Sequence, residues 1–127
     1  MKFNKIIQIL TLVLFTTFAQ ANIKTIQPQT MLKLIEKQQA PLIIDVRSAE
    51  EFYQGHIPGA RNIDYKLLSK SQQLNAYKEK DIVLYCHSGR RAQIASQILQ
   101  EKGFNQLITL QGNMIEWQQL HYPLAYF

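Results

Sequence analysis

The stretch that decides the fold runs from Ile82 to Arg91 and reads IVLYCHSGRR. Its first four residues are apolar, and β-branched and aromatic side chains of this kind are typical of a buried strand. The strand stops at Cys86, and residues 91–102 follow with apolar side chains at helical spacing, closed by Gly103. A strand that turns into a helix at a cysteine directs backbone N–H groups toward the sulfur, and helix starts stabilise thiolates. Cys86, the only cysteine in the chain, is therefore a candidate nucleophile.

On either side of this stretch, short apolar runs alternate with helical patterns, which is typical of a parallel α/β sheet. Pro28 opens the first helix, and Ser48 with Glu51 forms a capping-box pattern at the start of the second. Strands are expected at residues 23–26, 42–46, 61–63, 82–85 and 107–110. Helices are expected from Pro28 to before Pro41 and at 49–54, between 64 and 77, at 91–102 and at 114–120. The predicted fold is α/β, a doubly wound sheet of about five mainly parallel strands with helices on both faces.

Three of these strands end in polar or glycine-containing sequence. Asp45 and Val46 end one strand, Cys86 follows another, and Gln111-Gly112 follow a third. Ligands of doubly wound sheets bind outside the carboxyl ends of the strands. We therefore expect these residues to meet on one rim of the sheet.

The first 21 residues have the pattern of a secretory signal peptide. Lys2 and Lys5 precede an apolar run over 6–15, and Ala19-Gln20-Ala21 has the small-x-small form of a cleavage site. The alternative is a membrane anchor, but the run is shorter than the roughly 20 apolar residues that a spanning helix needs. We expect a cleaved signal peptide at 1–21, no stable membrane anchor, and a single exported domain at 22–127.

Charge and composition narrow the function classes. The formal net charge is +5, without a block of like charges, so the sequence does not indicate a nucleic-acid partner. One cysteine and three dispersed histidines lack the spacing of metal ligands, so neither a metal nor another cofactor is expected. An unpaired thiol in an exported protein is exposed to oxidation, which favours a chemical role for Cys86 over the alternative of an inert buried thiol.

Four signatures, in order, carry a family resemblance. They are Asp45-Val46-Arg47, then Glu51-Phe52 with residues 55–60 (GHIPGA), then Cys86 to Arg91, then Leu110-Gln111-Gly112 followed by Trp117. With them the chain resembles a single-domain rhodanese of the thiosulfate sulfurtransferase family, and its predicted export resembles that of small periplasmic rhodaneses. Two positions depart from the family pattern: Asn113 stands where a second glycine is common, and Ala92 where serine is frequent.

The resemblance implies a reaction in two steps. Cys86 takes the outer sulfur of thiosulfate or a similar small anionic donor as a persulfide. It then passes this sulfur to cyanide or to a thiol acceptor, for example a thioredoxin-like protein. The resemblance also implies a periplasmic protein, and we expect a monomer.

The same resemblance assigns roles around Cys86. The substrate-binding loop comprises His87, Ser88, Gly89, Arg90 and Arg91. Arg91 stands at the position of the arginine that closes the loop. Arg90 is a candidate for binding the donor's sulfonate, with a solvated surface arginine as the alternative. His87 either donates to the donor or is a simple loop residue. Asp45 and Arg47 are expected to support the site structurally.

Two other functions remain open. Cys86 and Arg91 form a C-x4-R loop, whereas related phosphatases and arsenate reductases use C-x5-R, and Ala92 stands where that arginine would be needed. The shorter loop favours sulfur over phosphate. The chain could also act as a persulfide carrier that delivers sulfur to a protein partner, and the sequence does not separate this function from turnover.

Overall fold

The computed structural model describes residues 11–14 and 23–127 of the chain. The predicted signal peptide and its cleavage site fall largely outside these residues. Within the described part of the chain, no helix is long and apolar enough to cross a membrane.

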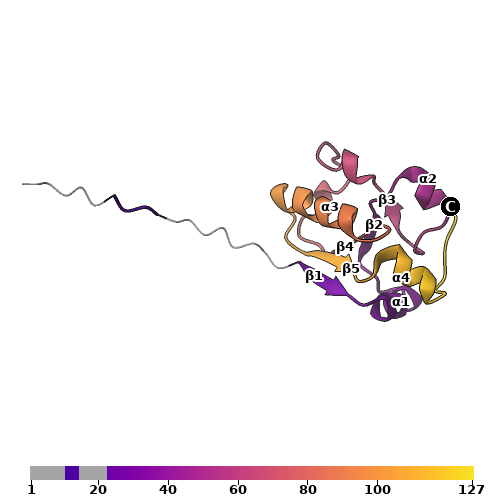
Figure 1. Cartoon of the computed structure of the whole chain (residues 1–127). Helices are drawn as coiled ribbons and strands as arrows, with labels where there is room; N and C mark the ends of the chain where they lie inside the picture. The colour runs from indigo at the N-terminus through magenta and orange to yellow at the C-terminus, as the bar shows by residue number, and fades with distance from the viewer. Residues whose placement is uncertain (1–10, 15–22) are drawn as a thin grey trace, which may run out of the picture.

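Five parallel strands form a single sheet (Figure 1). The sheet order is β1-β5-β4-β2-β3, and every pairing is parallel. The strands are β1 (Lys24–Ile26), β2 (Leu42–Asp45), β3 (Arg61–Asn62), β4 (Ile82–Tyr85) and β5 (Leu107–Leu110). The central strand β4 is buried at all four positions, because it is paired on both edges and covered on both faces. The predicted α/β fold is confirmed.

Helices cover both faces of this sheet. The helices are α1 (Pro28–Glu36), α2 (Ala49–Tyr53), α3 (Arg90–Glu101) and α4 (Asn113–Gln119). Side chains of α1, α2 and α4 pack with Val83 and Tyr85 of β4 on one face, around the fully buried Trp117. Side chains of α3 pack with Ile82 and Leu84 on the other face. Alternate residues of β4 therefore contribute to two separate cores, as the two-residue period of a strand requires.

The prediction of a helix between Asp64 and Tyr77 is wrong. That segment holds two single 3-10 turns instead, η1 (Tyr65–Leu67) and η2 (Asn75–Tyr77). Its buried leucines are Leu68 and Leu74, six residues apart, which is not a helical repeat, and Leu67 is 62% exposed. The Lys102 ammonium donates to the carbonyls of Leu68 and Ser71, so a distant side chain, and not the next turn of a helix, binds these carbonyls. Distant packing therefore overrides the local leucine pattern.

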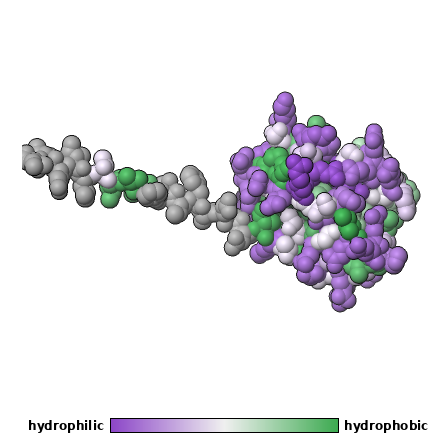
Figure 2. All heavy atoms as spheres, viewed as in Figure 1, coloured by the Kyte–Doolittle hydropathy of each residue, from purple (hydrophilic) through white to green (hydrophobic). Residues whose placement is uncertain are grey.

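The C-terminal segment closes the molecule next to α2. The backbone of Ala125 exchanges two hydrogen bonds with that of His56, and the indole N–H of Trp117 donates to the carbonyl of Pro123. His56 is buried and stacks on Phe52. The face of the molecule seen in Figure 2 is mainly hydrophilic, with small separate hydrophobic areas. The buried apolar side chains of the described residues form the two cores on either face of the sheet.

Substitution of Gly112, the residue before α4, tests whether this helix start requires glycine. Its φ of +73° lies in the left-handed region, and a Cβ there would overlap the Cβ of Glu116. Gly103 provides a matched control, because its φ is +92° and no atom lies within 4 Å of an added Cβ. We expect Gly103→Ala to lower the free energy of unfolding by about 1–2 kcal/mol through backbone strain alone. Gly112→Ala should cost about 1–3 kcal/mol more through overpacking.

Urea denaturation of both variants and the wild type measures these differences. Equal losses in the two variants would contradict the proposed steric requirement at Gly112.

Candidate active site

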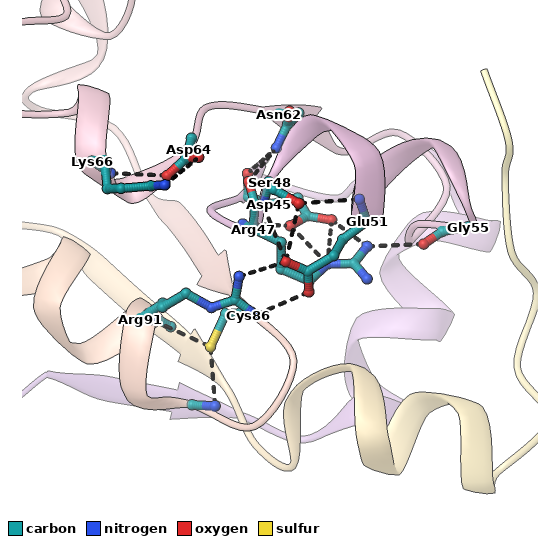
Figure 3. A network of polar contacts seen from close by, with 12 residues as sticks. Asp45, Arg47, Ser48, Glu51, Gly55, Asn62, Asp64, Lys66, Cys86 and Arg91 are labelled. Carbon is teal, nitrogen blue, oxygen red and sulfur yellow. Dashed lines mark hydrogen bonds and ion pairs between the residues drawn. The ribbon is translucent and has the colours of Figure 1, made fainter.

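Cys86 lies at the base of the loop that joins β4 to α3 (Figure 3). Its Sγ accepts hydrogen bonds from the backbone N–H of Gly89 at 3.0 Å and from that of Ala92 at 3.4 Å. Ala92 is the third residue of α3, and its N–H has no acceptor within the helix. Gly89 has a φ of +113°, which lets its N–H turn back toward the sulfur. Cys86 is only 1% exposed, so its sulfur is buried against these two backbone N–H groups.

The start of α4 holds the backbone of the same loop. The N–H of Cys86 donates to Oδ1 of Asn113 at 3.0 Å. Its carbonyl accepts from the N–H of Met114, and the carbonyl of His87 accepts from the N–H of Ile115. The chain on both sides of the sulfur is therefore fixed by a second helix start.

Arg91 joins the loop to α2. Its guanidinium donates to both carboxylate oxygens of Glu51, at 2.6 and 2.9 Å (Figure 3). This bidentate bond is the main reason that the pKa of Glu51 is lowered to about 2, with burial opposing and Ser48 adding to the shift. The bond to Glu51 also raises the pKa of Arg91, with smaller contributions from the charges of Cys86 and Asp45. Arg91 thus carries its charge beside the sulfur while it is tied to another element.

The other loop side chains face solvent. His87, Ser88 and Arg90 are exposed, and Gly89 is half-buried. Arg90 is the first residue of α3, and among the described residues its side chain makes no ion pair or hydrogen bond. Of the two arginines, only Arg90 therefore has a guanidinium that is free to approach an anion from outside.

Asp45 and Arg47 form a buried ion pair at the end of β2. Three side-chain hydrogen bonds join them, the shortest at 2.6 Å, and Arg47 also donates to the carbonyl of Gly55. Burial lowers the pKa of Arg47, but the hydrogen bonds and the charge of Asp45 outweigh it, so this pKa is raised overall. The pair connects β2 to the end of α2, the helix that carries Glu51.

Tyr85 lies next to this pair. Its phenol oxygen accepts the N–H of Ile57, and the Arg47 guanidinium lies 5.8 Å from the centre of its ring. Burial, together with the nearby charge of Asp45, raises the pKa of the Tyr85 phenol. Tyr85 is therefore a neutral, hydrogen-bonded group immediately before Cys86.

A groove of about 360 Å³ borders the loop on its α3 and β5 side. Gly89, Ala92 and Asn113 line it, but Cys86 does not. Within the described part of the chain, no three His, Cys, Asp or Glu side chains come together as metal ligands would. The chemistry that this rim offers is that of one sulfur, backbone N–H donors and two arginines.

Sequence reasoning did not assign Glu51, Tyr85 or Asn113 to this site. The sequence places Glu51 in a capping box, which it does form with Ser48, and in one of the family signatures, but neither pattern assigns it to the site. Its bond to Arg91, forty residues away, leaves no local pattern. Asn113 stands where the family commonly has glycine, and this departure is the only feature of the sequence that sets Asn113 apart.

Fold and site together define a class of α/β domains that hold a cysteine between a central strand and a helix start, in a short loop closed by an arginine. Comparison with known families matches residues 27–120 to the rhodanese-like domain. The chain belongs to this family.

Three relatives illustrate the range of the family. An uncharacterised Synechocystis protein is 36% identical over 104 residues, covering 82% of this chain and 56% of its own length. The putative sulfur carrier protein YrkF of Bacillus subtilis is 31% identical over 98 residues, covering 76% and 52%. A sulfurtransferase of Allochromatium vinosum is 31% identical over 84 residues, covering 66% and 78%. The chain thus spans only about half the length of the first two relatives.

Solved structures agree on the fold. The crystal structure of a rhodanese-related protein from Thermoplasma volcanium superposes with a TM-score of 0.68 at 24% identity. The match covers 82% of this chain and 99% of that one. At this identity the likeness shows the shared fold.

The Arg91–Glu51 bond predicts a pH dependence of stability. The ordinary pKa of glutamate, 4.5, is lowered to about 2 in the folded chain. The stabilising effect of the Glu51 carboxylate is therefore fully present above pH 4.5 and is lost as the pH falls toward 2. For this partly exposed pair we expect Glu51→Gln to lower the free energy of unfolding by about 1 kcal/mol at neutral pH.

Denaturation of the wild type and of Glu51→Gln across pH measures this difference, which should shrink toward pH 2. Glu101→Gln, on the exposed last turn of α3, is the control and should show little difference at any pH. A loss in Glu51→Gln that stays constant with pH would contradict the ionic role of Glu51.

Proposed function

We propose that this chain is a sulfurtransferase that moves sulfane sulfur from thiosulfate, or a similar anionic donor, to cyanide or a thiol through a persulfide on Cys86. One observation carries the proposal. The Cys86 Sγ accepts the N–H groups of Gly89 and Ala92 at a helix start, where a thiolate is favoured. Family membership supports the same chemistry, since the matched relatives include a sulfurtransferase.

The first step forms an S–S bond and breaks another. The Cys86 thiolate attacks the outer sulfur of thiosulfate, and the bond between the two thiosulfate sulfurs breaks with its electron pair leaving on sulfite. The enzyme then carries one persulfide with a single negative charge. In the second step, cyanide or an acceptor thiolate attacks the outer persulfide sulfur and restores the Cys86 thiolate. The covalent intermediate divides one transfer into two simpler displacements.

The loop can bind an anion without rearrangement. The N–H groups of Arg90 and Arg91 lie in the first turn of α3 and have no acceptor within the helix. Backbone donors at a helix start favour negative charge, and fixed donors need no reorganisation during the reaction. The exposed Arg90 guanidinium then binds the sulfonate of the donor, while Arg91, tied to Glu51, keeps the loop closed.

Loop length argues against phosphate or arsenate chemistry. The arginine bound to Glu51 is the fifth residue after Cys86, and the sixth, Ala92, has no charge and donates its N–H to the sulfur. A guanidinium at that place would be required for a C-x5-R loop. The site therefore suits a sulfur atom and an external sulfonate better than an enclosed tetrahedral phosphate.

A persulfide carrier is the second candidate. One relative is described as a putative sulfur carrier protein, and the exposed His87, Ser88 and Arg90 would be accessible to a protein acceptor. For both functions we propose an exported, periplasmic monomer with residues 1–21 removed as a signal peptide. A thioredoxin-like protein is a suitable thiol acceptor.

Thiocyanate formation from thiosulfate and cyanide tests the proposed enzyme. The wild type should form thiocyanate and Cys86→Ser should form none, because a serine hydroxyl cannot form a persulfide. Ser69→Ala, a change of similar size at an exposed serine outside the Cys86 loop, is the control and should retain turnover. An inactive wild type would contradict the enzyme, and faster hydrolysis of p-nitrophenyl phosphate than conversion of thiosulfate would contradict the argument from loop length.

Arg90 should act mainly on donor binding. Arg90→Ala removes a charged hydrogen bond to the sulfonate, so we expect the KM for thiosulfate to rise by about tenfold with a smaller change in kcat. Arg61→Ala removes another exposed arginine, on β3, two strands away from β4 and with its guanidinium over the Tyr77 ring, and should leave the KM within about twofold, since exposed charges are screened by salt. An equal effect of the two variants would show that Arg90 contributes only general positive charge.

A further inference from the structure

Asn113 contacts both ends of the Cys86 loop. Its Oδ1 accepts the N–H of Cys86 at 3.0 Å, and its Nδ2 would lie 3.0 Å from a Cβ added to Gly89. The side chain is therefore packed against the residue that carries the sulfur and against one of the two residues that donate to it. Asn113 is itself buried, with 8% of its surface exposed.

The N–H of Cys86 has no other acceptor among the residues described. The pairing of β4 with β5 ends at Leu84 and Thr109, so Cys86 lies beyond the ladder of the sheet. Without the Asn113 side chain, this N–H would be a buried donor that lacks a partner. Such a group costs about 1–3 kcal/mol where it stays unpaired, so the loop would move to find one.

The backbone of Asn113 forms the turn into α4, whereas its side chain binds the N–H of Cys86. Its φ of +50° lies in the left-handed region, which asparagine tolerates and glycine adopts freely. Glycine at this position would thus keep the turn into α4, and with it the bonds from Met114 and Ile115 to the loop carbonyls. Only the hydrogen bond to Cys86 and the contact with Gly89 would be lost.

We propose that the Asn113 side chain positions Cys86 for sulfur transfer by fixing the peptide N–H of Cys86 and thereby the place of Sγ opposite the N–H groups of Gly89 and Ala92. Asn113 acts through Cys86 and not on the sulfur donor. This inference rests on the proposed function for its kinetic consequence, but its geometric part is independent of the reaction.

Asn113→Gly separates the two roles, and Asn113→Asp keeps an oxygen acceptor at the same place. We expect Asn113→Gly to accelerate hydrogen exchange of the Cys86 amide by about five- to tenfold relative to core amides of β4, as loss of one hydrogen bond implies. Asn113→Asp should retain the protection. In thiosulfate turnover, Asn113→Gly should lower kcat by about tenfold with little change in KM, because the sulfur and not the donor site is displaced.

Gln38→Gly is the matched control. Gln38 also has a positive φ, at +55°, but lies exposed after α1, so its replacement should change neither measurement. Wild-type exchange at Cys86 in Asn113→Gly, or acceleration of all core amides by the same factor, would overturn the inference. A wild type that does not react with thiosulfate would instead contradict the proposed function, and the exchange measurement would then decide alone on Asn113.

Discussion

The hydrogen bonds from the Gly89 and Ala92 N–H groups to the Cys86 sulfur are the interaction on which the rest of this site depends. They exist because the chain passes from β4 to α3 within four residues, with Gly89 in the left-handed region. The fold therefore supplies the donors, and the side chains around the loop maintain their position.

Three separate contacts hold the Cys86 loop and its N–H donors in position. Arg91 binds Glu51 of α2, and the Asp45–Arg47 pair ties β2 to the end of that helix through the Gly55 carbonyl. The start of α4 holds the loop backbone through its N–H groups and the Asn113 side chain. Arg90 is left outside this network and faces solvent. Among the described residues of the loop, Arg90 is thus the arginine without a side-chain partner, which supports the proposed binding of an anionic donor.

Local patterns predicted most of the fold, because its helices and strands are short and regular. β4 has the bounds that its apolar run indicates, and the Ser48–Glu51 capping box forms as the sequence suggests. The helix predicted between Asp64 and Tyr77 does not form, because contacts with Lys102 and with distant parts of the core determine the conformation of this segment. Arg91 binds Glu51, which lies 40 positions away in the chain, and Asn113 binds Cys86, which lies 27 positions away. No short sequence pattern encodes such pairs.

In the proposed reaction, Cys86 carries sulfur as a covalent persulfide. Intact-protein and peptide mass spectrometry after incubation with thiosulfate detects this intermediate. We expect a gain of one sulfur atom on the peptide that contains Cys86, removed by cyanide or a small thiol and absent in Cys86→Ser. A wild-type chain whose Cys86 remains an unmodified thiol under these conditions would contradict the proposed reaction.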